Sequence, residues 1–190
     1  NFAHRAMKRM HSISCPAWLL CANMDPTAFT VREEKIRLNK LITRCGICKV
    51  YDPVRGGEHP PVKTFQALWD TGATNSVITK VVVDKLGLSP IGMGRVYTPQ
   101  GEAITNMYLV NLLLPNNIGI PSLRVSEGIL KGFDVLIGMD IISLGDFAIT
   151  HKNDGTVFSF QLPSTHEYDF VKQINNSKQS IKAKKGRRRY

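Results

Sequence analysis

The sequence lacks any apolar run long enough to cross a membrane. Its 190 residues contain no uninterrupted apolar stretch of the roughly 18 residues that a membrane-spanning helix needs. The start of the chain also lacks the apolar core and the small-residue cleavage site of a secretory signal. These absences predict a protein that makes no membrane contact and that resides in the cytoplasm.

Acidic residues are missing from the C-terminal end. Residues 172–190 hold eight Lys or Arg and no Asp or Glu, and the first eleven residues add three basic residues without an acid. The overall net charge is +10, whereas the body between these ends has a net charge of −1. Residues 166–190 are therefore predicted to be a basic, disordered tail. Contact of this tail with nucleic acid or another polyanion is the functional alternative.

Cysteine is scarce and confined to the first 50 residues, at Cys15, Cys21, Cys45 and Cys48. The second pair has the C-x2-C spacing that suits two thiolates on one tetrahedral zinc ion. One prediction is therefore a structural zinc site made by all four residues. Disulfide bonds and unpaired buried thiols remain the alternatives.

Residues 1–50 form a cysteine-containing N-terminal segment with one helix signature. Thr30 precedes Glu33 by three positions, as in a capping box, and an imperfect apolar stripe continues from Val31 through Arg44. The pattern predicts a small helical segment. Residues 51–61 are rich in Gly and Pro and are predicted to be a linker.

Short β-rich runs dominate from residue 62 onward. They are interrupted by turn sequences, among them Thr98-Pro99-Gln100-Gly101 and Asn153-Asp154-Gly155. A short helix is expected after Gly138, within residues 139–144. Many short strands at this spacing predict an all-β, closed barrel over residues 62–165.

One tripeptide carries recognisable chemistry. Asp70-Thr71-Gly72 follows a β-rich run, and about 65 residues later an apolar run ends in Leu136-Ile137-Gly138 before the short helix. Over residues 62–162 these features, in this order, resemble the retropepsin-like aspartic peptidases, and the bacterial relatives in particular. The resemblance implies a small acid-protease barrel.

The same resemblance implies an aspartic endopeptidase that acts on polypeptides without a catalytic cofactor. Asp70 is the expected catalytic residue, and the expected scaffold of the active site is Thr71, Gly72, Ala73 and Gly138. Two carboxylates about 3 Å apart share one proton, so that one can activate water while the other supports the carbonyl oxygen. The chain has a single Asp-Thr-Gly, so an active enzyme must be a homodimer.

The family places a flap over bound substrate, and the hairpin around residues 95–108 falls at that position. The expected flap and substrate-binding residues are Thr98, Pro99, Gln100 and Gly101. Two other functions compete with proteolysis. One is an inactive, dimeric binding module with the same fold, and the other is a nucleic-acid-associated protein that uses the cysteine segment and the basic tail.

The sequence departs from the retroviral pattern at three places. Trp69 precedes the Asp where a smaller aliphatic residue is usual. Thr74 and Asn75 stand where retroviral enzymes carry acidic residues that hold substrate backbone. Met139 and Asp140 follow the distal Gly, where those enzymes have an Arg that pairs with the first acid. The acid and the Arg are missing together, which indicates a coupled replacement.

Overall fold

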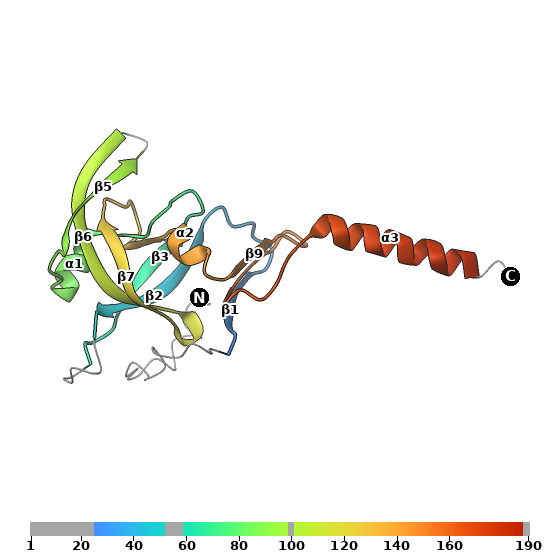
Figure 1. Ribbon diagram of the computed structural model, residues 1–190, viewed down its shortest axis with the longest axis horizontal. Coiled ribbons are helices and arrows are strands. Elements are labelled where there is room, and N and C mark those ends of the chain that lie inside the picture. The colour runs from blue at the N-terminus through green and yellow to red at the C-terminus, as the bar shows by residue number, and fades with distance from the viewer. Residues whose placement is uncertain (1–24, 52–58, 99–100, 188–190) are drawn as a thin grey trace.

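A computed structural model describes residues 25–51, 59–98 and 101–187, with side chains described as far as residue 178. Within these ranges, six strands close into a barrel through pairing of the first and last members, β2 and β6 (Figure 1). Their order around the barrel is β2 (Leu41–Lys49), β3 (Lys63–Trp69), β8 (Val135–Ile137), β4 (Val77–Ile78), β7 (Ile118–Glu127) and β6 (Gly101–Leu114). The predicted closed all-β architecture is confirmed.

A second, antiparallel sheet packs beside the barrel in the order β1-β10-β9. Its strands are β1 (Thr27–Glu33), β9 (Asp146–Thr150) and β10 (Thr156–Leu162). Asn153 and Asp154 have φ values of 53° and 59° and make the turn between β9 and β10. Asn and Asp tolerate this left-handed conformation better than most residues. The hairpin predicted from the sequence is therefore present.

The helix predicted over residues 30–44 is wrong, because β1 and β2 occupy this stretch. The Thr30 hydroxyl pairs with the Ser159 hydroxyl at 2.9 Å rather than capping a helix. Val31, Ile42 and Thr43 are β-branched and favour strands. Since β2 lies between β3 and β6, the barrel begins before residue 62, and residues 41–49 belong to its wall.

Trp69 joins the barrel to the second sheet. Its ring lies 5.1–5.9 Å, centroid to centroid, from four phenylalanines of the second sheet: Phe29, Phe147, Phe158 and Phe160. The indole nitrogen donates a hydrogen bond to Thr43 Oγ1 at 2.9 Å, so its polar group is satisfied although the side chain is buried. The unusual bulk at this position therefore fills the junction between the two sheets.

Three short helical elements interrupt the strands: α1 (Lys80–Leu86), the 3-10 turn η5 (Pro115–Asn117) and α2 (Met139–Ile142). Gly87 ends α1 with a φ of 59°, a left-handed conformation that glycine adopts without steric cost. α2 confirms the short helix expected after Gly138. It lies at the mouth of the barrel beside the end of β3 (Figure 1).

The basic C-terminal stretch forms a helix, α3 (Phe170–Arg187), and the expectation of a disordered tail is wrong for these residues. The carboxylate of Asp169 accepts the Lys172 amide at 2.9 Å and caps the helix start. No Pro or Gly lies between Phe170 and Gly186, so nothing in this stretch interrupts a helix. None of the helices in the described residues is long and apolar enough to span a membrane.

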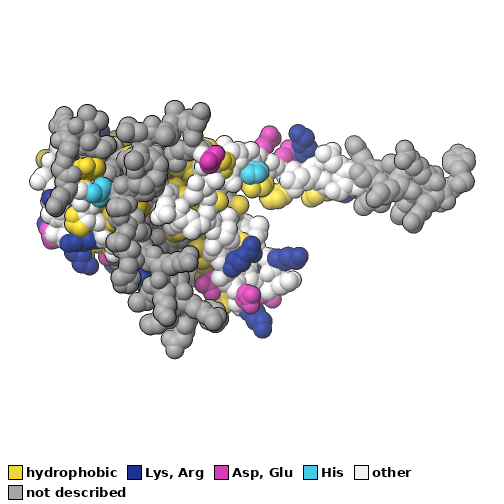
Figure 2. Space-filling model, turned by 90° about the horizontal axis from the view of Figure 1, so that it is seen from below, with side chains coloured by type: hydrophobic (Ala, Val, Ile, Leu, Met, Phe, Trp, Pro, Cys, Tyr) yellow, Lys and Arg dark blue, Asp and Glu magenta, His cyan; other side chains and the backbone are white. Residues whose placement is uncertain are grey.

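α3 extends away from the two sheets (Figure 1). Phe170, Val171 and Ile174 are 65%, 70% and 53% exposed. Hydrophobic side chains are visible at the surface of the described part of the helix in Figure 2. The helix is therefore not held by an extensive apolar contact with the body.

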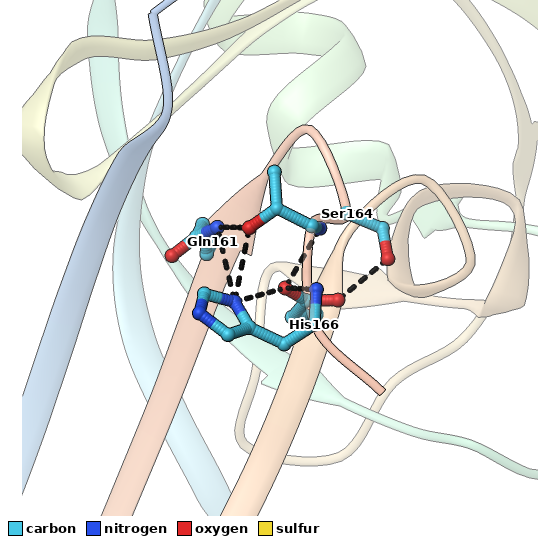
Figure 3. A network of polar contacts seen from close by, with 5 residues as sticks. Gln161, Ser164 and His166 are labelled. Carbon is cyan, nitrogen blue, oxygen red and sulfur yellow. Dashed lines mark hydrogen bonds and ion pairs between the residues drawn. The ribbon is translucent and has the colours of Figure 1, made fainter. Parts of the chain in front are cut away.

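The turn that precedes α3 carries Ser164 and His166, which lie in one network of polar contacts (Figure 3). Both bond to Asp146 at the start of β9. The Asp146 carboxylate accepts the Ser164 hydroxyl, the backbone amides of Thr165 and His166 at 3.0 Å each, and the His166 ring nitrogen at 3.0 Å. These bonds, the one from Ser164 first, lower the pKa of Asp146 to about 2. Asp146 thus anchors the end of the folded body.

Candidate active site

Asp70 lies on a tight turn directly after β3. Its backbone amide donates to the Ile137 carbonyl at 2.9 Å and so extends the parallel ladder between β3 and β8. The Gly72 amide donates to Asp70 Oδ1 at 2.8 Å, and the Ala73 amide donates to the Asp70 carbonyl at 3.3 Å. Asp70 is half-buried, whereas Thr71 and Gly72 are exposed. A carboxylate is thereby held by backbone groups at the surface of the barrel mouth.

Two glycines permit close approaches around this turn. A Cβ on Gly72 would lie 3.1 Å from Asp70 Oδ1. A Cβ on Gly138 would lie 2.7 Å from the Asn75 carbonyl carbon and 2.9 Å from the Ala73 carbonyl oxygen. The second obstacle is backbone, which cannot move aside without displacing the turn. Gly138 therefore lets the end of β8 pass directly beneath the Asp70 turn.

The start of α2 donates into the same turn. The Met139 amide bonds to the Ala73 carbonyl at 2.8 Å, and the Asp140 amide bonds to the Thr74 carbonyl at 3.1 Å. The Asp140 carboxylate accepts both the amide and the hydroxyl of Ser76, at 2.9 and 2.8 Å. Sequence reasoning treated Asp140 only as a departure from the retroviral pattern. It missed Ser76, because the two residues are 64 positions apart and share no local motif.

An apolar stripe lies on the sheet face that also carries Asp70. Leu68 precedes Asp70 by two positions, so the two side chains emerge on the same face. Ladder pairing continues this face from Ile42 to Leu68, then to Leu136 and Val77. Leu68, Leu136 and Val77 are half-buried and Ile42 is 42% exposed. The stripe can therefore accept apolar side chains of a molecule that lies beside Asp70.

The β5–β6 hairpin, formed by β5 (Gly92–Thr98) and β6, projects beyond the barrel (Figure 1). Thr98 Oγ1 donates to the Gly101 carbonyl at 3.0 Å near its tip. Pro99 and Gln100 lie outside the described residues. The hairpin expected at this position is present, whereas its role as a flap stays a prediction.

Strand register assigns the two faces of the hairpin. Pairing of Val77 with Ser126, Ser126 with Met107 and Met107 with Gly92 continues the face of the apolar stripe onto the hairpin. The residues on that face are Gly94, Val96, Ala103 and Thr105. The opposite face carries Tyr97 and Ile104, which are 78% and 67% exposed. Small side chains thus line the face that continues from the stripe.

Two of the four candidate zinc ligands lie on β2. Cys45 and Cys48 are three positions apart in a strand, so their side chains leave opposite faces, which does not favour a shared metal ion. Burial raises the pKa of Cys45 to about 12, which disfavours the thiolate that zinc requires. Cys15 and Cys21 lie outside the described residues. The described part of the chain holds no cluster of three or more metal-binding side chains, and the four-cysteine zinc site stays a prediction.

Part of the chain matches a known protein family. Residues 54–141 match the family model described as aspartyl protease, and this stretch contains the Asp70 turn, the β5–β6 hairpin and the Gly138 strand end. No protein with a curated description matches the chain.

Three of the solved structures to which the chain is similar are the following. A retropepsin-like aspartic protease from Rickettsia conorii matches with a TM-score of 0.48 and 14% identity over 73% of this chain and 96% of that chain. The EIAV protease complexed with the inhibitor HBY-793 matches with a TM-score of 0.39 and 18% identity, over 57% of this chain and 92% of that chain. The retroviral protease-like domain of Ddi1 from Leishmania major matches with a TM-score of 0.37 and 19% identity, over 59% of this chain and 82% of that chain.

The resemblance inferred from Asp70-Thr71-Gly72 and Leu136-Ile137-Gly138 is confirmed, because residues 54–141 match the aspartyl protease family model.

Proposed function

We propose that the protein is an aspartic endopeptidase whose active site is assembled from two copies of the chain, each of which contributes Asp70. The observation that carries the proposal is the Asp70 turn itself. The carboxylate stands half-exposed at the barrel mouth, with one oxygen bonded to the Gly72 amide at 2.8 Å. A carboxylate held in this way is oriented before any substrate binds.

The need for two copies follows from the chemistry. Cleavage of a stable amide needs an activated water and a polarised carbonyl, and a pair of carboxylates that shares one proton can supply both. The ionised carboxylate takes a proton from water as the water attacks the carbonyl. The protonated carboxylate donates to the carbonyl oxygen. Since the sequence has one Asp-Thr-Gly, the second carboxylate has to come from another copy of the chain.

The proposed substrate is an extended polypeptide that lies between the apolar stripe and the β5–β6 hairpin. Leu68, Leu136 and Val77 would contact apolar side chains next to the scissile bond. Each buried methylene contributes about 0.8 kcal/mol of binding free energy, so we infer a preference for large apolar residues there. The hairpin would close over the peptide and exclude water.

Cleavage of denatured casein by the purified full chain tests this proposal. We expect cleavage that is blocked by a pepstatin-like inhibitor and reduced on the order of 10²- to 10⁴-fold by Asp70→Asn, the range attributed to a single acid–base group. Asp84→Asn is the matched control, because Asp84 is an exposed carboxylate on α1 that pairs with Lys80. Equal cleavage by Asp70→Asn and wild type would rule out Asp70 as the catalytic group. A dimer without cleavage would favour the binding module.

A further inference from the structure

The Asp70 turn is tied to α2 by a closed ring of hydrogen bonds. The Gly138 amide donates to Ser76 Oγ at 3.1 Å. Ser76 Oγ donates in turn to Asp140 Oδ1 at 2.8 Å, and the Ser76 amide donates to Asp140 Oδ2 at 2.9 Å. Ser76 is 1% exposed and Asp140 is half-buried, so water has little access to the Ser76 side of the ring, where hydrogen bonds are stronger than in water.

The direction of these bonds requires an acceptor at position 140. An ionised carboxylate only accepts, and both Ser76 groups donate to it. An asparagine could accept the Ser76 amide with its oxygen, but it would turn an NH2 group toward the hydroxyl. The hydroxyl proton would then lose its acceptor. The carboxylate of Asp140 therefore determines which group in the ring donates and which accepts.

The ring acts on the segment that presents Asp70. The segment is held at one end by the Asp70 amide on the Ile137 carbonyl at 2.9 Å, and at the other by the Ser126 amide on the Ser76 carbonyl at 3.2 Å. Between these points the backbone of α2 contacts Ala73 and Thr74. A change in the Asp140–Ser76 contact would thus shift the turn relative to α2 without touching Asp70 itself.

We propose that Asp140, through Ser76, is a positioning residue that sets the distance between the two Asp70 carboxylates of the assembled enzyme. This inference rests on the proposed function. Coupling between two carboxylates splits their apparent pKa values, and the split shrinks as the groups move apart. Loss of the ring therefore brings the acidic and basic limbs of the pH–rate profile closer together.

The test measures kcat, KM and the pH–rate profile of the full-length wild type, Asp140→Asn and Ser76→Ala. Protein concentration is kept high enough for kcat to be independent of it, and each protein's thermal unfolding is recorded. Ser143→Ala is the matched control, because the Ser143 hydroxyl donates to the Met139 carbonyl on the same helix but takes no part in the ring. Displacements of about 1 Å commonly cost up to about 10²-fold in rate. We expect kcat to fall about tenfold in both variants, with a nearly unchanged KM and a narrower pH profile.

The outcomes separate this inference from the proposed function. A kcat and a pH profile that match the wild type in both variants would overturn the positioning role while leaving Asp70 as the catalytic group. A lower kcat with an unshifted profile, explained by the fraction of unfolded protein, would also overturn it. If Asp140→Asn does not fold, Ser76→Ala decides by the same readouts, because it retains the carboxylate. Cleavage that is unaffected by Asp70→Asn would reject both proposals.

Discussion

The Asp70 turn and the β5–β6 hairpin stand at the same mouth of the barrel but are held in opposite ways. The Ile137 carbonyl of β8, the backbone amides of α2 and the side chain of Asp140 fix the turn. The hairpin is tied to β7 only near its base, where Thr105 and Asn106 donate to Glu127 at 2.8 and 3.2 Å. Beyond that point it is held by its own ladder and by an exposed ion pair between Arg95 and Glu102 at 2.7 Å. Exposed ion pairs stabilise little. The comparison indicates a firmly held turn beside a hairpin that is held less firmly.

A pair of glycine variants, one beside the Asp70 turn and one in the β5–β6 hairpin, should show the largest difference between the two regions. Gly138→Ala places a Cβ 2.7 Å from the backbone of Asn75, whereas Gly94→Ala places one 2.7 Å from the flexible Met107 Sδ. We expect Gly138→Ala to lower the free energy of unfolding by about 1–3 kcal/mol, the usual cost of overpacking, and to reduce cleavage strongly. Gly94→Ala should do neither to a comparable extent, because Met107 can adopt another rotamer.

Chemical denaturation and casein cleavage by the two variants provide the measurement. Equal destabilisation by both would mean that the hairpin is as firmly held as the turn, and the contrast would be lost.

The two faces of the hairpin offer a test with a smaller expected effect. Ala103 and Ile104 are neighbours on opposite faces, and both are exposed. Ala103→Arg puts a long cation on the face that continues from the apolar stripe. We expect kcat/KM to fall on the order of tenfold, equivalent to about 1.4 kcal/mol, chiefly through KM.

Ile104→Arg is the control and should cleave as the wild type does. Both variants should keep the wild-type free energy of unfolding within about 0.5 kcal/mol, as is usual for exposed sites. If Ile104→Arg impaired cleavage and Ala103→Arg did not, the face assignment would be reversed.

The C-terminal end shows the same contrast, because the turn after β10 is firmly held whereas α3 is exposed. Asp146 anchors the turn after β10, and its pKa of about 2 lies below the ordinary value of about 3.9. A depressed carboxyl pKa stabilises the folded state above the unfolded pKa, and this stabilisation is lost as the pH falls through about 2. Asp146→Asn should therefore lower the thermal unfolding midpoint at pH 7, and the difference from wild type should close between about pH 4 and pH 2.

Thermal unfolding of both proteins across that pH range checks this expectation. A difference that persisted unchanged at pH 2 would show that the Asp146 charge is not the source of the stabilisation.

Removal of α3 should have the smallest effect on cleavage. The exposed Phe170, Val171 and Ile174 indicate that little of the helix supports the body. A chain that ends at residue 169 should keep the kcat/KM of the full chain. It should lose any salt-dependent retention on duplex DNA at low ionic strength, since residues 172–190 carry eight basic side chains. A truncated chain with impaired cleavage would instead assign α3 a part in the catalytic assembly.

The sequence predicted the parts of the site that have local signatures. Asp70-Thr71-Gly72, the apolar run before Gly138 and the short helix after it are each readable within a few residues. The strands β1 and β2 were missed because an imperfect apolar stripe and a capping pattern favoured a helix. Their pairing with β10 and β3 is long-range and outweighs local propensity.

The contacts that hold the Asp70 turn could not be predicted from the sequence, because they too join residues that are far apart in the chain. Ser76 and Asp140 meet only because β8 returns beside β3 and is followed directly by Gly138 and α2. Trp69 was recognised as unusual, but its place depends on four aromatic rings from three separate strands. Short sequence motifs identify residues such as Asp70, whereas the residues that support the Asp70 turn come together only in the folded topology.

Titration of a fixed amount of wild type with the inactive Asp70→Asn chain tests the shared active site most directly. If each site needs one Asp70 from each of two chains, added variant captures wild-type subunits in mixed pairs, and casein cleavage falls toward zero as the variant comes into excess. An activity that stays constant across the titration would show that one chain suffices, and it would contradict the account.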